Sequence, residues 1–321
     1  MAHNVETMAY VGKLPWHGLG QNLGDRDVTG PEMLQAAGLD WQVRLGALYT
    51  VEGAEVPSHF AIHRLDTGAV LGVVGSRYAP VQNAELFGIP DMLVKEGICG
   101  YHTAGSLRDG RIVWALARMG EYTVTRLDGE ADLIQRYLLW TTRHDGLAPV
   151  VGGFTDVRVV CNNTLDAAMT RGLTNRFSIR HTASASARLD EAHRFLNQLM
   201  ASAAGQSEEF QRMARVRMDA DAMRDFATEW LGETAGETKK EAKRRQEVAE
   251  LVHLFEAGRG NTGESLWDAF NSVTEWLDHH RARYRGASER IKAERKLEST
   301  LSGQAYAKKG KARALLTRVG S

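Results

Sequence analysis

Tyr137-Leu-Leu-Trp-Thr-Thr-Arg-His-Asp-Gly146 is an apolar run that ends in a polar cluster. A second run, Thr155-Asp-Val-Arg-Val-Val-Cys-Asn-Asn-Thr-Leu165, ends in two asparagines and a threonine. Both runs consist largely of the β-branched, aromatic and aliphatic residues that form strands. Core packing alone does not require polar clusters at these positions, whereas binding residues often lie where strands end in loops. We therefore expect two strands that present polar groups at their ends.

Further strand candidates surround these two segments and are separated by turn signals. Asp109-Gly110 lies between two of them, and this dipeptide predicts a tight hairpin. The other candidate strands of the first half are 41–51, 59–63, 70–74, 101–107, 111–119, 122–127 and 177–182. Proline at a first turn, glycine after a last turn and helical spacing of apolar residues predict short helices over 31–37, 82–95 and 164–170.

The pattern changes at residue 184, after which apolar residues recur at spacings of three and four. This spacing is typical of helices with one buried face, and we expect four, one of them over 210–230. Strands followed by helices predict an α+β fold with a mainly antiparallel sheet and packed helices, and a helical C-terminal part. The predicted domains are an α+β core over 1–183, a helical region over 184–285 and a basic C-terminal tail over 286–321.

The composition limits the class of protein. The 321 residues are 43% hydrophobic, and no apolar run approaches the roughly 20 residues that a membrane-spanning helix needs. No signal peptide is visible, and two cysteines provide neither a disulfide framework nor a four-cysteine zinc site, so a reducing cytoplasm is expected. The net charge of zero hides a basic end, because residues 281–321 carry 12 Lys/Arg and 3 Asp/Glu, a net of +9. This end is either an arm for a polyanion or a solvated helix.

Catalytic motifs are weak in this sequence. The glycine pairs lack the full phosphate-loop pattern, and no Gly-Lys-Ser/Thr occurs. His144, Asp145, Cys161 and His181 would suit zinc if their strands were neighbours, but their spacing matches no zinc signature. Cys161 as a nucleophile, or His144 and His181 as an acid and base, are further alternatives. We expect no catalytic residue, no metal and no cofactor.

Nucleic-acid binding has more support from the sequence. Residues 133–186 carry six arginines and three aspartates, a net of +3, and a strand face with arginines suits a phosphate backbone. The alternative is ion pairing of these arginines with local carboxylates. The predicted backbone contacts are Arg111, Arg118, Arg143, Arg158, Arg176 and Arg180. The predicted positioning residues are His144, Asn162, Asn163 and His181.

Several motifs resemble a known family, the phage/plasmid-like proteins with the domain of unknown function DUF932. The resemblance extends from Trp16-His17-Gly18 to residues 267–279, and it implies a phage, prophage or plasmid setting with little known biochemistry. Its most specific motifs are Tyr78-Ala-Pro-Val-Gln-Asn83, Ala104-Gly-Ser-Leu107, Val113-Trp-Ala-Leu116, His144-Asp-Gly146, Val157-Arg-Val-Val-Cys-Asn-Asn-Thr-Leu165 and Ile179-Arg-His-Thr182.

A second resemblance concerns Glu85-Leu-Phe-Gly88, which follows a β segment and precedes the predicted hairpin. It is similar to the annealing domain of Rad fifty-two-type proteins, although Ala84 separates Glu85 from Asn83 here. That family holds single-stranded DNA in a basic groove of an oligomeric ring. The resemblance implies an oligomeric, ATP-independent protein that binds and anneals single-stranded DNA, with a phage or host replication or recombination protein as a further partner and no membrane. The alternatives are a hydrolase or nuclease, with or without a metal, and a protein-binding phage factor without nucleic-acid affinity.

Overall fold

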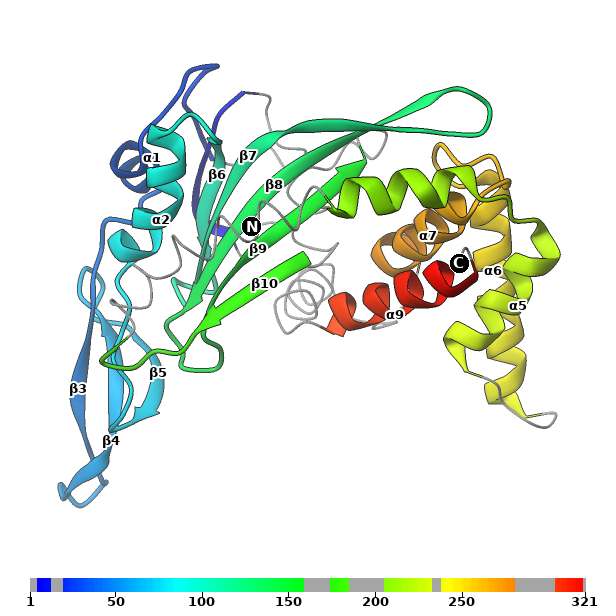
Figure 1. Cartoon of the computed structure of the whole chain (residues 1–321). Helices are drawn as coiled ribbons and strands as arrows, with labels where there is room; N and C mark the ends of the chain where they lie inside the picture. Colours follow the sequence, from blue (N-terminus) through cyan, green and yellow to red (C-terminus); the bar gives the residue numbers. More distant parts are fainter. Residues whose placement is uncertain are drawn as a thin grey trace. The chain divides into compact units, whose positions relative to one another are not determined.

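The computed structural model describes residues 5–12, 20–158, 174–184, 205–232, 238–280 and 304–319 (Figure 1). The chain divides into two compact units. Unit 1 consists of residues 1–120, 136–155 and 173–201, and unit 2 of residues 121–135, 156–172 and 202–321. The predicted class is confirmed, since a mostly antiparallel sheet forms from the first half and helices from the second. No helix among these described residues is long and apolar enough to cross a membrane.

The larger sheet has seven strands in the order β10-β9-β8-β7-β6-β1-β2. β1 pairs with β6, β6 with β7 and β9 with β10 in antiparallel fashion, whereas β1 and β2 are parallel. The long neighbouring strands β7, β8 and β9 are visible in Figure 1. The strands are β1 (Val5–Tyr10), β2 (Gln21–Asn22), β6 (Gly100–Leu107), β7 (Ile112–Thr125), β8 (Ala131–Arg143), β9 (Val150–Arg158) and β10 (Thr174–Ile179).

The hairpin between β6 and β7 forms where the Asp-Gly dipeptide predicts it. Arg108, Asp109 and Gly110 have φ angles of 56°, 58° and 88°, and the Arg111 N–H donates to the Arg108 carbonyl at 3.2 Å, so Asp109 and Gly110 are the two central residues of the turn. Two successive positive φ angles define the turn whose twist matches that of paired strands. This turn places Arg111 directly before β7.

The smaller sheet and two helices complete the described part of unit 1. The sheet has the order β3 (Val43–Tyr49), β4 (Glu55–Arg64) and β5 (Val70–Gly75). The helices are α1 (Gly30–Ala36) and α2 (Asn83–Lys95). Gln82, the residue before α2, exchanges two hydrogen bonds with the backbone of Val43, at 3.0 and 2.9 Å. These bonds hold the start of α2, and therefore Asn83, against β3.

Unit 2 contains the helical segment 205–215 and further helices with apolar faces turned toward a shared core. The predicted single helix over 210–230 is wrong, because the helix is interrupted at residues 216–219. Asp219 accepts a hydrogen bond from Ala222 N at 2.8 Å and so begins a new helix. The helices are α5 (Ala220–Leu231), α6 (Lys239–Ala257), α7 (Leu266–Glu275), the π-helical turn η1 (Trp276–His280) and α9 (Gln304–Val319).

The tip of the β7–β8 hairpin belongs to unit 2, although most of the hairpin belongs to unit 1. The predicted strand over 122–127 is a continuation of β7, and Val124 and Ile134 are buried in the helical core. Trp267 Nε1 also donates to Asp132 Oδ2 at 2.8 Å. The two units therefore divide the chain differently from the predicted division at 183/184, because Val124 and Ile134 of the hairpin tip belong to the second core.

Part of the predicted basic tail is a packed helix. Ala312 and Leu316 of α9 are fully buried in the core of unit 2. Lys311 Nζ donates to the Trp230 carbonyl at 2.8 Å. Residues 304–319 therefore have a structural role in unit 2.

Candidate functional site at the strand ends

Polar residues gather at the end of the larger sheet where β7 begins, β8 ends, β9 begins and β10 ends. The His144 N–H donates to the Arg111 carbonyl at 2.9 Å, which joins the turn after β8 to the start of β7. Thr142 Oγ1 lies 3.3 Å from His181 Nε2, which joins β8 to the segment after β10. We call this group the strand-end site. It brings together five of the predicted residues: Arg111, Arg143, His144, Arg180 and His181.

Arg143 and Asp145 form a buried ion pair within the strand-end site. Arg143 is 5% exposed and Asp145 8% exposed. The guanidinium donates to both carboxylate oxygens, with Nε–Oδ1 at 3.0 Å and Nη2–Oδ2 at 2.5 Å. Breaking such a pair by removing one partner costs about 3–5 kcal/mol, because a charge is left buried. The predicted phosphate contact through Arg143 does not fit this geometry, since the guanidinium is buried and already forms an ion pair with the Asp145 carboxylate.

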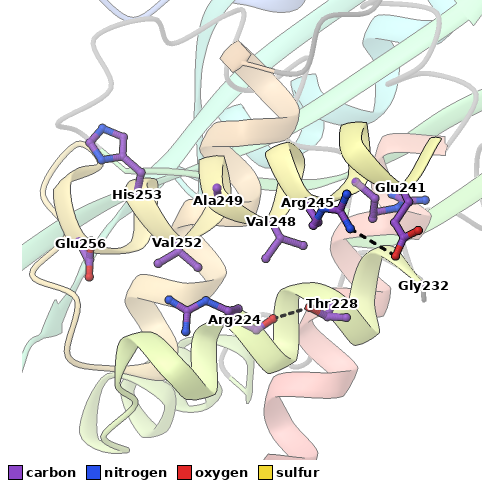
Figure 2. Close-up of a pocket in the computed structure, with 11 residues that line it drawn as sticks. Arg224, Thr228, Gly232, Glu241, Arg245, Val248, Ala249, Val252, His253 and Glu256 are labelled. Carbon is purple, nitrogen blue, oxygen red and sulfur yellow. Dashed lines mark hydrogen bonds and ion pairs between the residues drawn. The ribbon is translucent and has the colours of Figure 1, made fainter. Parts of the chain in front are cut away.

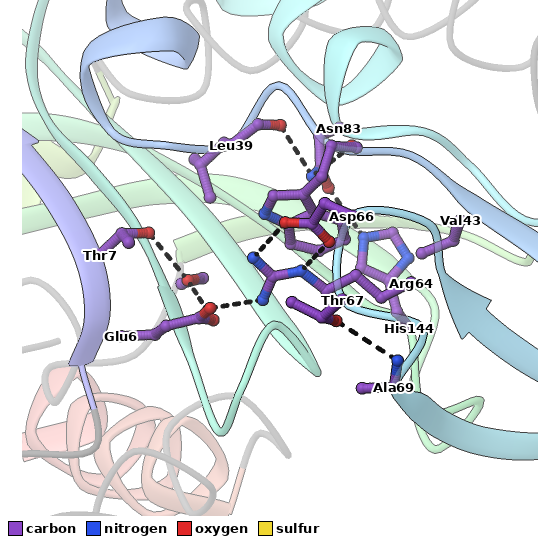
Figure 3. Close-up of polar contacts among 12 residues, drawn as sticks. Glu6, Thr7, Leu39, Val43, Arg64, Asp66, Thr67, Ala69, Asn83 and His144 are labelled. Carbon is purple, nitrogen blue, oxygen red and sulfur yellow. Dashed lines mark hydrogen bonds and ion pairs between the residues drawn. The ribbon is translucent and has the colours of Figure 1, made fainter.

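His144 is fully buried and its protonation state follows from its neighbours (Figure 3). Asn83 Nδ2 donates to the carbonyls of Leu39 and Trp41, at 2.9 and 3.3 Å, so Asn83 Oδ1 is left as an acceptor. His144 Nε2 lies 2.8 Å from that oxygen and therefore carries the proton. Burial, with a smaller effect of the nearby His181, lowers the pKa of His144 to about 3. The imidazole is neutral at pH 7 and anchors the turn to α2.

His181 is 6% exposed and is held from two sides. Its ring stacks on Tyr78, with centroids 4.9 Å apart and planes 17° apart. Its carbonyl accepts a hydrogen bond from Ala79 N at 3.1 Å. Burial lowers the pKa of His181 to about 4, and burial, with a smaller effect of Asp145, raises the pKa of Tyr78. The two predicted histidines are thus neutral groups packed inside the fold rather than side chains presented to solvent.

A second set of polar contacts supports the strand-end site from the smaller sheet (Figure 3). Arg64 of β4 donates to Glu6 at 2.5 Å and to both oxygens of Asp66 at 2.7 and 3.0 Å. Its guanidinium carbon lies 4.3 Å from the ring centroid of Trp41, whose ring in turn meets His144 at 5.4 Å. Arg64 and Trp41 were not predicted from the sequence. The sequence did point to Tyr78 and Asn83, because both belong to the motif at 78–83 on which the family resemblance rests.

The remaining predicted residues have different environments. Arg111 is half-buried and donates from Nε to the Leu71 carbonyl at 3.0 Å. Arg180 is exposed, directly after β10. Arg118 is exposed on β7, seven residues along the chain from Arg111 and away from the strand-end site. Arg158 and Arg176 lie on β9 and β10, but their side chains, like Asn162 and Asn163 as a whole, lie outside the described residues.

Another histidine of unit 1, His102, also has a lowered pKa. Burial, with a smaller effect of Arg118, lowers the pKa of His102 to about 4.

The zinc alternative gains no support here, because no cluster of three or more His, Cys, Asp or Glu that could hold a metal occurs in the described ranges. Cys161, one of the residues considered for it, lies outside those ranges.

Unit 2 contains a groove of about 830 Å³ between α5 and α6 (Figure 2). Val248, Ala249 and Val252 supply its apolar wall. Its arginines have nearby carboxylates, as the pairs Arg224–Asp221 at 2.5 Å, Arg244–Glu247 at 3.0 Å and Arg245–Glu241 at 3.5 Å show. The charges at this groove are therefore largely balanced by local ion pairs, and the groove offers apolar surface rather than unpaired positive charge.

Comparison with known proteins gives a family match. A family model described as Domain of unknown function (DUF932) matches residues 70–306, about three quarters of the chain. The match begins at β5 and includes every described residue of the strand-end site. No curated protein and no solved structure matches the chain.

Proposed function

The chain belongs to the DUF932 family, and from this premise we propose that it binds single-stranded DNA and, as an oligomer, anneals complementary strands without ATP. Charge within unit 1 supports the proposal. Its described residues from 70 to 184 carry nine Lys/Arg and five Asp/Glu, a net of +4. The described residues from 5 to 69 carry three Lys/Arg and eight Asp/Glu, a net of −5. The excess positive charge thus lies on the part that contains β6 to β10.

The observation that carries the proposal is the exposure of Arg118 and Arg180 on this positive part. Guanidinium groups on a rigid sheet can hold phosphates by charge and by paired hydrogen bonds. Annealing requires that the backbone is held while the bases stay free to pair. We further propose other copies of this chain and a phage or host replication or recombination protein as partners, in the cytoplasm of a bacterial host of a phage or plasmid.

The test combines binding with annealing. Fluorescence anisotropy of a labelled oligonucleotide should show binding that weakens with salt, with a log–log slope of about −4 for about six phosphate contacts. Without any nucleotide cofactor, the protein should also accelerate pairing of two complementary labelled strands. Absence of binding at roughly 50 mM salt, where phosphate contacts are strongest, would exclude the proposal.

The same oligonucleotides separate the alternatives. A nuclease would shorten them on a denaturing gel, but its acid and base would have to reach the substrate. The burial of His144 and His181 gives less support to that role. A protein-binding factor without nucleic-acid affinity would give neither binding, annealing nor cleavage.

A further inference from the structure

We propose that Arg77 and Arg180 form a two-arginine clamp that holds phosphates of the bound single strand. This inference rests on the proposed function and adds Arg77, which the sequence did not indicate, to the predicted contact Arg180. Arg77 follows β5 of the smaller sheet, and Arg180 follows β10 of the larger one. The two residues are 103 positions apart in the chain, and tertiary contacts bring their segments together.

Both arginines lie on turns whose backbone is fixed. Tyr78 N donates to the Gly75 carbonyl at 3.0 Å, so Arg77 lies inside a hydrogen-bonded turn. Thr182 N donates to the Arg180 carbonyl at 2.9 Å, which fixes the chain directly after β10. A side chain on a fixed backbone loses less freedom on binding than one on a mobile loop.

Two contacts join these turns side by side. Ala79 N donates to the His181 carbonyl at 3.1 Å, and the rings of Tyr78 and His181 stack at 4.9 Å. Arg77 and Arg180 are thus each within two residues of the same hydrogen bond. The stacked rings of His181 and Tyr78 therefore hold the turn of Arg77 against the turn of Arg180.

The charge around the turns favours an anion. The side chains of Arg77 and Arg180 are exposed, and neither side chain has a hydrogen bond or ion pair with any residue in the described part of the chain. The neighbouring carboxylate of Asp145 is occupied by Arg143, and Arg111 donates to a carbonyl. Two exposed arginines on adjoining turns can supply guanidinium groups to the oxygens of one phosphate or of two successive phosphates.

The test compares two double variants that remove the same charge. Arg77→Gln with Arg180→Gln removes the clamp. Arg26→Gln with Arg44→Gln removes two exposed arginines from the acidic part of unit 1, where Arg26 has a solvent-exposed ion pair with Glu32. Binding of the full-length protein to a labelled oligothymidine is measured from low to moderate salt. Circular dichroism and urea midpoints check that all proteins are folded.

The clamp variant should bind on the order of ten-fold more weakly, with a log–log salt slope smaller by about 1.4, the effect of two lost single-strand phosphate contacts. The control variant should keep the wild-type slope. Equal slopes for the wild type and the clamp variant would overturn the clamp and leave the proposed function intact. An equal loss in both variants would also overturn it, because net charge would then be the cause.

If the wild type binds no oligonucleotide, the proposed function itself fails, and the clamp with it. Labelled poly-glutamate gives a separate outcome. Its capture by the wild type but not by the clamp variant, without oligonucleotide binding, would assign the two arginines to an acidic protein segment and contradict the clamp.

Discussion

Arginines that look alike in the sequence have different environments in this fold. Arg143 and Arg180 each precede a histidine at the end of a strand. Arg143 is buried against Asp145, whereas Arg180 is exposed. The spacing of Arg143 and Asp145 allowed a local ion pair, which was the alternative interpretation of the arginines. Sequence spacing does not give burial, and burial determines which arginine can reach a phosphate.

The buried histidines predict a specific response to acid. The usual histidine pKa is 6.5, and the folded protein lowers it to about 3 at His144 and about 4 at His181. Below pH 6.5 the unfolded chain therefore binds more protons than the folded protein, and the free energy of unfolding falls as the pH decreases. His144→Gln should reduce this fall by up to about 1.4 kcal/mol per pH unit between pH 6 and 4.5.

Urea unfolding at several pH values measures the effect. The variant should be less stable than the wild type at pH 7, because the hydrogen bond to Asn83 is altered, but its stability should depend less on pH. The same substitution at His59, which is exposed on β4, serves as the matched control. An unchanged pH dependence in His144→Gln would contradict a neutral His144 in the folded state.

At the scale of elements, β5 packs directly on the turn that follows β8. A Cβ added at Gly72 would lie 2.5 Å from the carbonyl oxygen of Asp145 and 2.7 Å from its Cα. Gly146 makes the reciprocal approach, because its added Cβ would overlap Val74 Cγ1. These glycines allow the smaller sheet to approach the strand-end site closely. Because Arg77 follows β5, the same close packing brings Arg77 to the strand-end site.

Gly72→Ala should therefore destabilise unit 1 by about 1–3 kcal/mol, since the clash is with backbone that cannot rotate away. Gly75→Ala is the matched control on the same strand, where an added Cβ meets nothing within 4 Å. Urea unfolding followed by circular dichroism compares the two variants. Equal stability of Gly72→Ala and Gly75→Ala would show that β5 does not approach the turn this closely.

At the scale of the whole molecule, the two units share strands. Residues 121–135 leave unit 1 as the tip of the β7–β8 hairpin and bury Val124 and Ile134 among the helices of unit 2. The same two strands therefore contribute residues to both units. The stability of the helical unit should then depend on residues that lie before it in the sequence.

Ile134→Ala tests this dependence. Removing the buried side chain should cost about 2–4 kcal/mol, and the loss should concern unit 2. Hydrogen exchange should become faster in α5 and α7, with β3 to β5 unchanged. Ile62 is fully buried in β4, so Ile62→Ala serves as a control that should speed exchange in β3 to β5 and leave α5 and α7 unchanged. Faster exchange in β3 to β5 of Ile134→Ala, with α5 and α7 unaffected, would refute the assignment of the hairpin tip to unit 2.

The sequence by itself determined features that depend on neighbouring residues. Asp109-Gly110 predicted the hairpin because its backbone preference is local. The recurrence of apolar residues at spacings of three and four after residue 184 predicted a helical C-terminal part, and the order of strands and helices predicted the α+β class. Helical spacing did not show the break at 216–219, because the break depends on the bridge between Arg217 and the distant Ser265.

Only the tertiary structure decided the environment of the candidate residues. The polar cluster at 143–145 was visible in the sequence, but its burial against Asn83, Tyr78 and His181 depends on packing between distant segments. The same packing places Arg77 near Arg180, which no spacing in the chain could indicate. Backbone preference is a property of a few adjacent residues, whereas solvent exposure is set by every segment that packs around a side chain.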